Sequence, residues 1–128
     1  MNLVDSSGWL EYFADGSNAD YFSNAVQDTE NLIVSTVNLR EVFKHIFLQW
    51  EQRDENSAFQ AIALMQQGKI VEVSPTIALK AAKNNIGLKL PMADSIIFST
   101  AQASNATLWT QDSDFENLSG LNFIRKKQ

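Results

Sequence analysis

Four aspartates stand at positions where their carboxylates could work together. Asp5 directly follows an apolar run at the start of the chain, Asp112 and Asp114 follow a second apolar run, and Asp94 lies near the start of a helix-like segment. Each alone has an ordinary explanation, because Asp favours turns, helix caps and first helical turns. Carboxylates brought together without basic neighbours repel one another unless a cation offsets their charge. Oxygen ligands suit Mg²⁺ or Mn²⁺, ions that serve phosphodiester hydrolysis.

The segment 90–101 predicts the helix that carries Asp94. One helical face gathers small and apolar side chains, namely Ala93, Ile96, Ile97, Thr100 and Ala101. Pro91 suits the first helical position, where its missing N–H would have no partner. Asp94 then lies in the first turn, at the flank of this face. A carboxylate there loses hydration and needs a cation, donors or a proton. The alternative interpretation is an acidic first-turn residue that only complements the helix dipole.

Strand-like and helix-like segments alternate along the chain. Strands are predicted at 1–5, 31–35, 69–73, 106–110 and 122–124. Helices are predicted from a Ser6 or Ser7 cap to Phe13, and over 19–27, 36–52, 58–65, 75–87 and 90–101. This alternation indicates an α/β fold with a mainly parallel sheet. Such sheets bind ligands beyond the carboxyl ends of their strands, where Asp5 and Asp112 are expected.

The composition of the chain limits the classes of protein to which it can belong. The chain has 128 residues, a net charge of −5, 45% hydrophobic and 20% charged residues and no cysteine. We expect one domain over residues 1–128, with no disulfide or thiolate site. The charge argues against a non-specific nucleic-acid binder, but not against an enzyme that holds a polyanion through metal ions. Because no apolar run has transmembrane length and Asp5 comes too early for a signal peptide, we expect a soluble cytoplasmic protein with no membrane partner.

Four short segments resemble the motifs of PIN-domain ribonucleases, and most closely those of VapC-type toxins from bacterial toxin–antitoxin pairs. They are Val4–Ser7, Asn38–Val42, Leu90–Ile97 and Thr110–Phe115. Each is weak alone, but the four occur in order and span essentially the whole chain. The resemblance implies a single PIN domain over 1–128, with a mainly parallel five-stranded sheet flanked by helices.

The same resemblance implies a site and an activity. It implies a catalytic quartet around Mg²⁺ or Mn²⁺, formed by Asp5, Glu41, Asp94 and Asp112, of which Asp5, Asp94 and Asp112 are the expected metal ligands. Auxiliary roles are implied for Ser6, Thr110 and Asp114. The implied activity is endoribonuclease cleavage of RNA by a homodimeric toxin that a cognate antitoxin inhibits.

The helix predicted from residue 36 raises three questions. Glu41 lies opposite the apolar stripe of this helix, so periodicity alone predicts a solvated side chain and only the motif selects it. Arg40 could contact phosphate or pair with an acid. His45, the single histidine, could pair with Glu41 or face solvent, and it is not expected to be a general base because a metal ion can activate water without it. Phe43 and Phe47, with the neighbouring Trp50, predict a dimer interface formed by the region 36–52 and its helical neighbours.

Other functions fit less well. A receiver-like interaction module needs a cluster of acids after the first strand and an acceptor Asp after a middle strand, but only Asp5 follows the first strand and no Asp ends the segment 69–73. An inactive PIN-like scaffold is the second alternative, and the full acidic quartet argues against it. No serine has a visible histidine partner for a triad, and an Asp-x-Asp phosphatase is disfavoured because Ser6 and Ser7 follow Asp5. Trp9, Trp50 and Trp109 are expected to pack rather than to stack on bases.

Overall fold

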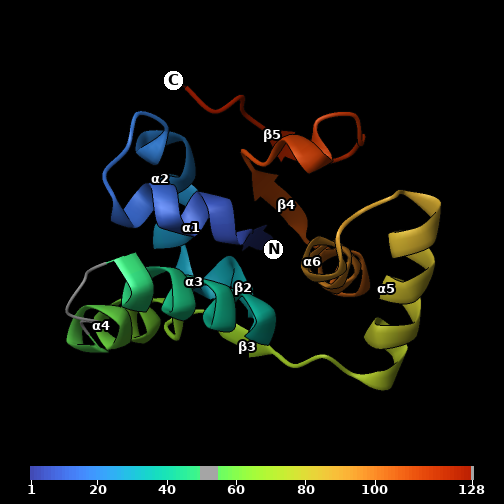
Figure 1. Cartoon of the computed structure of the whole chain (residues 1–128), viewed down its shortest axis with the longest axis horizontal. Helices are drawn as coiled ribbons and strands as arrows, with labels where there is room; N and C mark the ends of the chain where they lie inside the picture. The colour runs from blue at the N-terminus through green and yellow to red at the C-terminus, as the bar shows by residue number, and fades with distance from the viewer. Residues whose placement is uncertain (50–54, 128) are drawn as a thin grey trace.

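Five parallel strands form the central sheet of the computed structural model, which describes residues 1–49 and 55–127 (Figure 1). The strands are β1 (Asn2–Val4), β2 (Leu32–Ser35), β3 (Lys69–Val71), β4 (Thr107–Thr110) and β5 (Asn122–Phe123). They lie in the order β3-β2-β1-β4-β5, and every neighbouring pair is parallel. The predicted α/β fold with a parallel five-stranded sheet is therefore confirmed.

The strand order creates a switch point beside β1. The chain places β2 and β3 on one side of β1 and then returns to place β4 and β5 on the other. Val4 is opposite Trp109, and the Asp5 N–H donates to the Trp109 carbonyl at 3.0 Å. The carboxyl ends of β1 and β4 thus lie side by side, which is where an open parallel sheet forms a ligand site.

Helices cover both faces of the sheet. They are α1 (Ser6–Phe13), α2 (Ala19–Gln27), α3 (Thr36–Gln49), α4 (Glu55–Met65), α5 (Pro75–Gly87) and α6 (Met92–Ala103), with 3₁₀ turns η1 (Thr29–Asn31) and η2 (Ser113–Phe115). Side chains of the central strands alternate between two cores. Val4 and Val34 pack with α1 to α4 on one face, whereas Leu3 and Ile33 pack with α6 on the other. Helix α5 lies outside α6, at one edge of the molecule (Figure 1).

Two predicted helix starts need correction. The cap of α1 is Asp5 rather than Ser6 or Ser7, because the Asp5 carboxylate accepts from the Gly8 N–H at 2.9 Å. Pro91 precedes α6 instead of opening it, since its ψ of 159° is extended. Both shifts are single residues, which is the usual uncertainty of a helix end.

The buried face of α6 also differs from the predicted one. Ser95 and Ser99 are buried, whereas Ala93 and Ile96 are only half-buried. Both hydroxyls have partners: Ser95 donates to the Met92 carbonyl at 2.6 Å, and Ser99 accepts from Asn84 of α5 at 2.9 Å. Counting only apolar positions misplaced the face because hydrogen-bonded serines can be buried without penalty.

The aromatic face of α3 packs against α4 within the same chain. Phe43 stacks on Phe47 with ring centroids 5.8 Å apart, and its ring lies 5.1 Å from that of Phe59. Helix α4 begins at Glu55, earlier than predicted. Trp50 lies outside the described residues, while Trp9 is buried and Trp109 packs against Tyr21 as expected of packing residues. No helix in the described ranges is long and apolar enough to cross a membrane.

Gly8 allows α1 to lie close to the sheet. A Cβ at this position would fall 2.6 Å from Val4 Cγ1 and 2.7 Å from Phe22 Cε1. We expect Gly8→Ala to lower the free energy of unfolding by about 1–3 kcal/mol, because overpacking forces β1 and α2 to shift. Urea denaturation measures this. The matched control is Gly87→Ala, since a Cβ at Gly87 meets nothing within 4 Å. Equal stability of the two variants would contradict this packing.

Candidate functional site

Asp5 is the buried centre of the switch point. Its side chain is 2% exposed and accepts three hydrogen bonds. Oδ1 accepts from the Ser7 hydroxyl at 2.7 Å and from the Gly8 N–H, while Oδ2 accepts from the Thr110 hydroxyl at 2.5 Å. A carboxylate offers about four lone-pair positions, so Oδ2 keeps one for a further ligand.

Three aspartates gather next to Asp5. One oxygen from each of Asp94, Asp112 and Asp114 lies within 4.8 Å of the others, in a group that can hold a metal ion. Helix α6 supplies Asp94 from its half-buried first turn. Asp112 and Asp114 come from the segment after β4, where the Asp112 carboxylate caps η2 by accepting from the Asp114 N–H at 2.9 Å.

Thr110 links this group to Asp5. Its buried hydroxyl donates to Asp5 and accepts from the Asp112 N–H at 2.9 Å. The end of β4 therefore fixes the backbone of Asp112 relative to the Asp5 side chain. This is the kind of supporting contact that the sequence resemblance implied for Thr110.

Burial and mutual repulsion make two of these carboxyls reluctant to ionise. Loss of hydration, a side-chain hydrogen bond with Asp114 and the nearby charges of Asp112, Asp114 and Asp5 raise the pKa of Asp94 to about 8. Burial raises the pKa of Asp5 to about 6, although the hydrogen bonds from Thr110, Ser7 and Gly8 oppose that rise. The group thus stores electrostatic repulsion that protons or a cation can relieve.

Helix α3 supplies Glu41, which contacts the start of α1. Ser6 at the start of α1 donates its hydroxyl to Glu41 Oε1 at 2.6 Å and accepts from Asn38 Nδ2 at 3.1 Å. Glu41 is half-buried, so the solvated side chain that periodicity predicts is wrong. The surface of α3 opposite its apolar stripe faces the first turn of α1, and helical periodicity within α3 carries no information about that neighbour.

Two positioning residues were missed in the sequence. Asn38 is fully buried and also accepts from the Ser35 N–H at 3.1 Å, which fixes the start of α3 against β2. Ser7 donates to Asp5 and accepts from the Gln111 N–H at 3.3 Å. A signal existed for Asn38, because an Asn three residues after a strand often bonds back to the backbone. His45 is exposed, and the described residues show no bond from it to Glu41.

The donor set fits a hard divalent cation. Carboxylate oxygens without a nitrogen or sulfur ligand are the set that Mg²⁺ and Mn²⁺ prefer. The described residues contain one ion pair, between Arg125 and Glu116, so no cationic side chain neutralises this group. The structure brings Asp94, Asp112 and Asp114 into the tight group and joins Asp5 to it through Thr110, while Glu41 is bonded to Ser6, the residue that follows Asp5.

A family comparison agrees with this geometry. The model of the PIN domain matches residues 3–121, which is nearly the whole chain. The chain belongs to the PIN domain family. A search of curated proteins found no match.

Solved structures share this PIN fold at low sequence identity. A toxin–antitoxin complex from Klebsiella pneumoniae has 22% identity and a TM-score of 0.72, covering 97% of this chain and 96% of its own. VapC20 of Mycobacterium tuberculosis, described as a toxin that cleaves the sarcin–ricin loop, has 15% identity and a TM-score of 0.75, covering 98% and 100%. DNA-bound VapBC2 of Rickettsia felis has 14% identity and a TM-score of 0.71, covering 97% of each chain.

Asp94→Asn should stabilise this PIN domain when metal is absent. The native carboxyl keeps its proton to about pH 8, whereas an unfolded chain loses it near 3.8. Between these values the native state binds more protons, so the contribution of Asp94 to stability falls as pH rises. Because Asp94 is half-exposed and its charge partly screened, we expect the Tm in EDTA at pH 7.5 to rise by about 2–5 °C, and its pH dependence to flatten.

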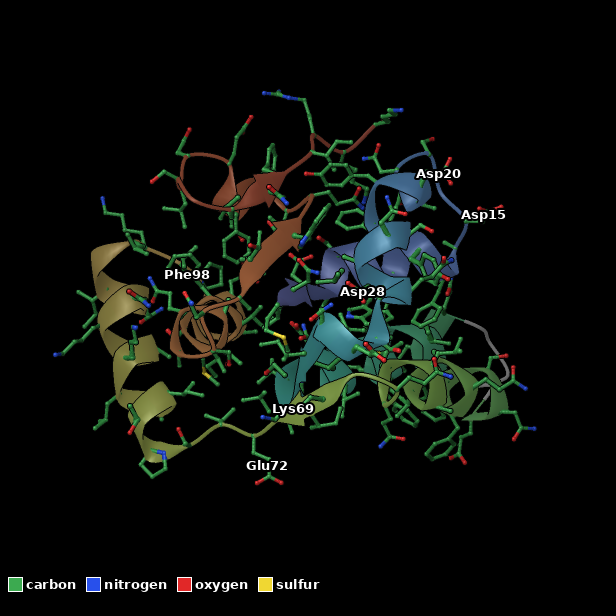
Figure 2. The ribbon with its side chains drawn as sticks, turned by 180° about the vertical axis from the view of Figure 1, so that it is seen from behind. Asp15, Asp20, Asp28, Lys69, Glu72 and Phe98 are labelled. Atoms are coloured by element: carbon green, nitrogen blue, oxygen red, sulfur yellow. The ribbon has the colours of Figure 1, made fainter. Side chains whose placement is uncertain are left out.

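The control is Asp15→Asn, which removes the same charge from the exposed turn after α1. Figure 2 shows Asp15 on the side of the molecule away from α5 and α6. The Asp15→Asn variant retains Asp94, so its Tm should keep the pH dependence of the unaltered chain. A clear drop in Tm for Asp94→Asn would mean instead that the ionised carboxylate supports the fold.

Proposed function

We propose that this PIN domain, formed by residues 1–128, is a Mg²⁺- or Mn²⁺-dependent endoribonuclease and the toxin of a toxin–antitoxin pair. The observation that carries the proposal is the group of Asp94, Asp112 and Asp114 at the switch point, next to buried Asp5. Family membership supports nuclease chemistry, and the toxin names of the structural neighbours support the biological role.

The acidic residues have different roles in this proposal, according to where they lie. Asp94 and Asp112, with Asp5 through its remaining lone pair, would hold the ion, and exposed Asp114 would complete its shell or orient water. When bound, the ion neutralises phosphate charge and lowers the pKa of the attacking water. Ser6, whose hydroxyl accepts from Asn38, donates to Glu41, and we assign the Glu41 carboxylate the role of accepting a proton from water.

Conservative substitutions of the acids test the activity. Asp5→Asn, Asp94→Asn and Asp112→Asn should each lower the rate of RNA cleavage more than about 100-fold, because each removes a charged oxygen ligand and keeps its shape. Cleavage is measured on total RNA with added Mg²⁺ or Mn²⁺, and EDTA should abolish it. Asp15→Asn serves as the matched control.

Two results would contradict the assignment. Cleavage by Asp94→Asn at a near-normal metal-dependent rate would remove Asp94 from the site. No metal-dependent cleavage by the unaltered chain would favour the inactive PIN-like scaffold.

An antitoxin should inhibit by placing a cation in the acidic group. Four aspartates in a chain of net charge −5 form a focused negative field. Arg suits this field, because its planar guanidinium binds carboxylates bidentately and stays charged when desolvated. We expect the inhibitory segment to carry an Arg or Lys into the site and therefore to compete with Mg²⁺.

The test is a titration of an Arg-containing antitoxin tail peptide at several Mg²⁺ concentrations and constant ionic strength. Affinity should fall as Mg²⁺ rises, and Asp94→Asn should weaken binding about tenfold. An affinity that ignores both the metal and the substitution would place the antitoxin elsewhere.

We also propose a homodimer, but the surface expected for it changes. The rings of Phe43 and Phe47 on α3 are half-buried and Phe43 contacts Phe59 of α4, whereas Leu79 and Ile86 on α5 and Met92 at the start of α6 are more than 70% exposed. Exposed apolar side chains of this size mark interfaces. Light scattering should give a dimer mass at micromolar concentrations, and Leu79→Glu with Ile86→Glu should shift it toward the monomer. A monomer mass for the unaltered chain would refute the dimer.

A further inference from the structure

A groove between α1 and α3 leads away from the Glu41 side of the acidic site. Its volume is about 520 Å³. Ser6 and Leu10 line it from α1, and Arg40, Glu41, Lys44 and Leu48 line it from α3. Glu41 is bonded to Ser6, which directly follows Asp5 in the chain, so this groove begins next to the end of β1 and a linear molecule in it would run toward the site.

Two cations dominate the charge of this groove. Arg40 and Lys44 are exposed and lie one helical turn apart, about 6 Å along the axis of α3. Neither forms an ion pair within the described part of the chain, where only Arg125 and Glu116 are paired. Their sole acidic neighbour in the lining is Glu41, whose carboxylate already accepts from Ser6. Long cationic side chains at this spacing can meet successive phosphates of one strand.

The groove also offers surface for a base. Leu48 is 52% exposed although it is a large apolar residue, and Leu10 faces it from α1. The exposed His45 also lines the groove, and its ring has a π-face on which a base can stack. Apolar contact and stacking do not depend on base identity, so the groove fits a single strand of varied sequence.

A second groove at the site carries less positive charge. It has a volume of about 630 Å³ and reaches the Asp112 side of the acidic group. Its cations are Arg125 and Lys126, but Arg125 is paired with Glu116. Glu11 and Asp112 add further negative charge to its wall. Among the described residues, the second groove therefore offers one unpaired cation, Lys126, beside three acids, whereas the groove between α1 and α3 offers two unpaired cations beside one acid.

We propose that the groove between α1 and α3 binds the sugar–phosphate backbone of single-stranded RNA next to the scissile phosphate, with Arg40 and Lys44 as phosphate ligands. The proposal rests on the proposed nuclease function and names how its substrate is held. In a chain of net charge −5, these two cations offset the repulsion that an approaching polyanion meets at the acidic group.

The experiment compares matched double variants in the full chain. Arg40→Gln with Lys44→Gln removes two charges from the groove, and Lys80→Gln with Lys83→Gln removes two charges from exposed positions on α5. Both pairs are made in the Asp94→Asn background, which prevents cleavage. Binding of a labelled random-sequence single-stranded RNA is measured at several salt concentrations, and urea unfolding checks that all proteins are folded.

We expect the groove variant to bind RNA at least about tenfold more weakly, and the slope of log affinity against log salt to fall by about 1.4, or 0.7 for each lost phosphate contact. The α5 variant should keep both values. Arg40→Lys with Lys44→Arg should retain most of the binding, because it keeps both charges.

Three results would overturn the groove assignment: equal affinity of the two glutamine variants, no measurable RNA binding by the Asp94→Asn protein at low salt, or weakened antitoxin binding with RNA affinity unchanged. Cleavage by the unaltered chain is scored separately. Cleavage without any role for Arg40 and Lys44 would leave the nuclease function standing, whereas RNA held by these residues without cleavage would refute the nuclease function alone.

Discussion

The repulsion among partly desolvated carboxylates at the ends of β1 and β4 is the constraint on which this structure depends. A buried Asp5 and three further aspartates around it would oppose folding if all were ionised, and the raised pKa values of Asp94 and Asp5 express that opposition. Hydrogen bonds from Thr110, Ser7 and the Gly8 N–H stabilise the buried Asp5 carboxylate. No cationic side chain among the described residues forms an ion pair with the other three aspartates. A site that costs stability in this way is typical of function rather than of packing.

The fold concentrates these charges through its topology. Because β1 lies between β2 and β4, the first turns of α1 and α3 and the segment after β4 all meet at one edge of the sheet. Helix α6 brings Asp94 to the same edge from the face where Leu3, Ile33 and Ile97 pack. One turn further along α6 is Phe98, which Figure 2 labels. The centroid of its ring lies 6.3 Å from that of Phe115 in η2. Helix α3 also carries Arg40 and Lys44 in the groove that Ser6 and Glu41 line, so positive charge lies on one side of a centre that would repel a polyanion without metal.

Strand positions and fold class could be predicted because strand and helix periodicities are local properties of the chain. Asp5, Asp112 and Asp114 could be placed at strand ends for the same reason. Glu41 could not, since the neighbour that buries it, Ser6, is 35 residues away. Ser95 and Ser99 were misjudged because their burial depends on partners that periodicity does not show. The dimer face predicted on α3 and its helical neighbours stays a prediction, and the structure adds that Phe43 contacts Phe59 of α4, a tertiary contact that the pattern of α3 does not contain.

The central claim is that the aspartates at the switch point form a divalent-cation site. Direct titration of the protein with Mn²⁺, followed by the electron paramagnetic resonance signal of the free ion at pH 7, tests it without an RNA substrate. We expect saturable binding with release of protons, because binding must displace the proton that Asp94 holds. We also expect binding to weaken at least about tenfold in Asp94→Asn and Asp112→Asn but not in Asp15→Asn. Absence of saturable binding, or equal binding by all three variants, would contradict it.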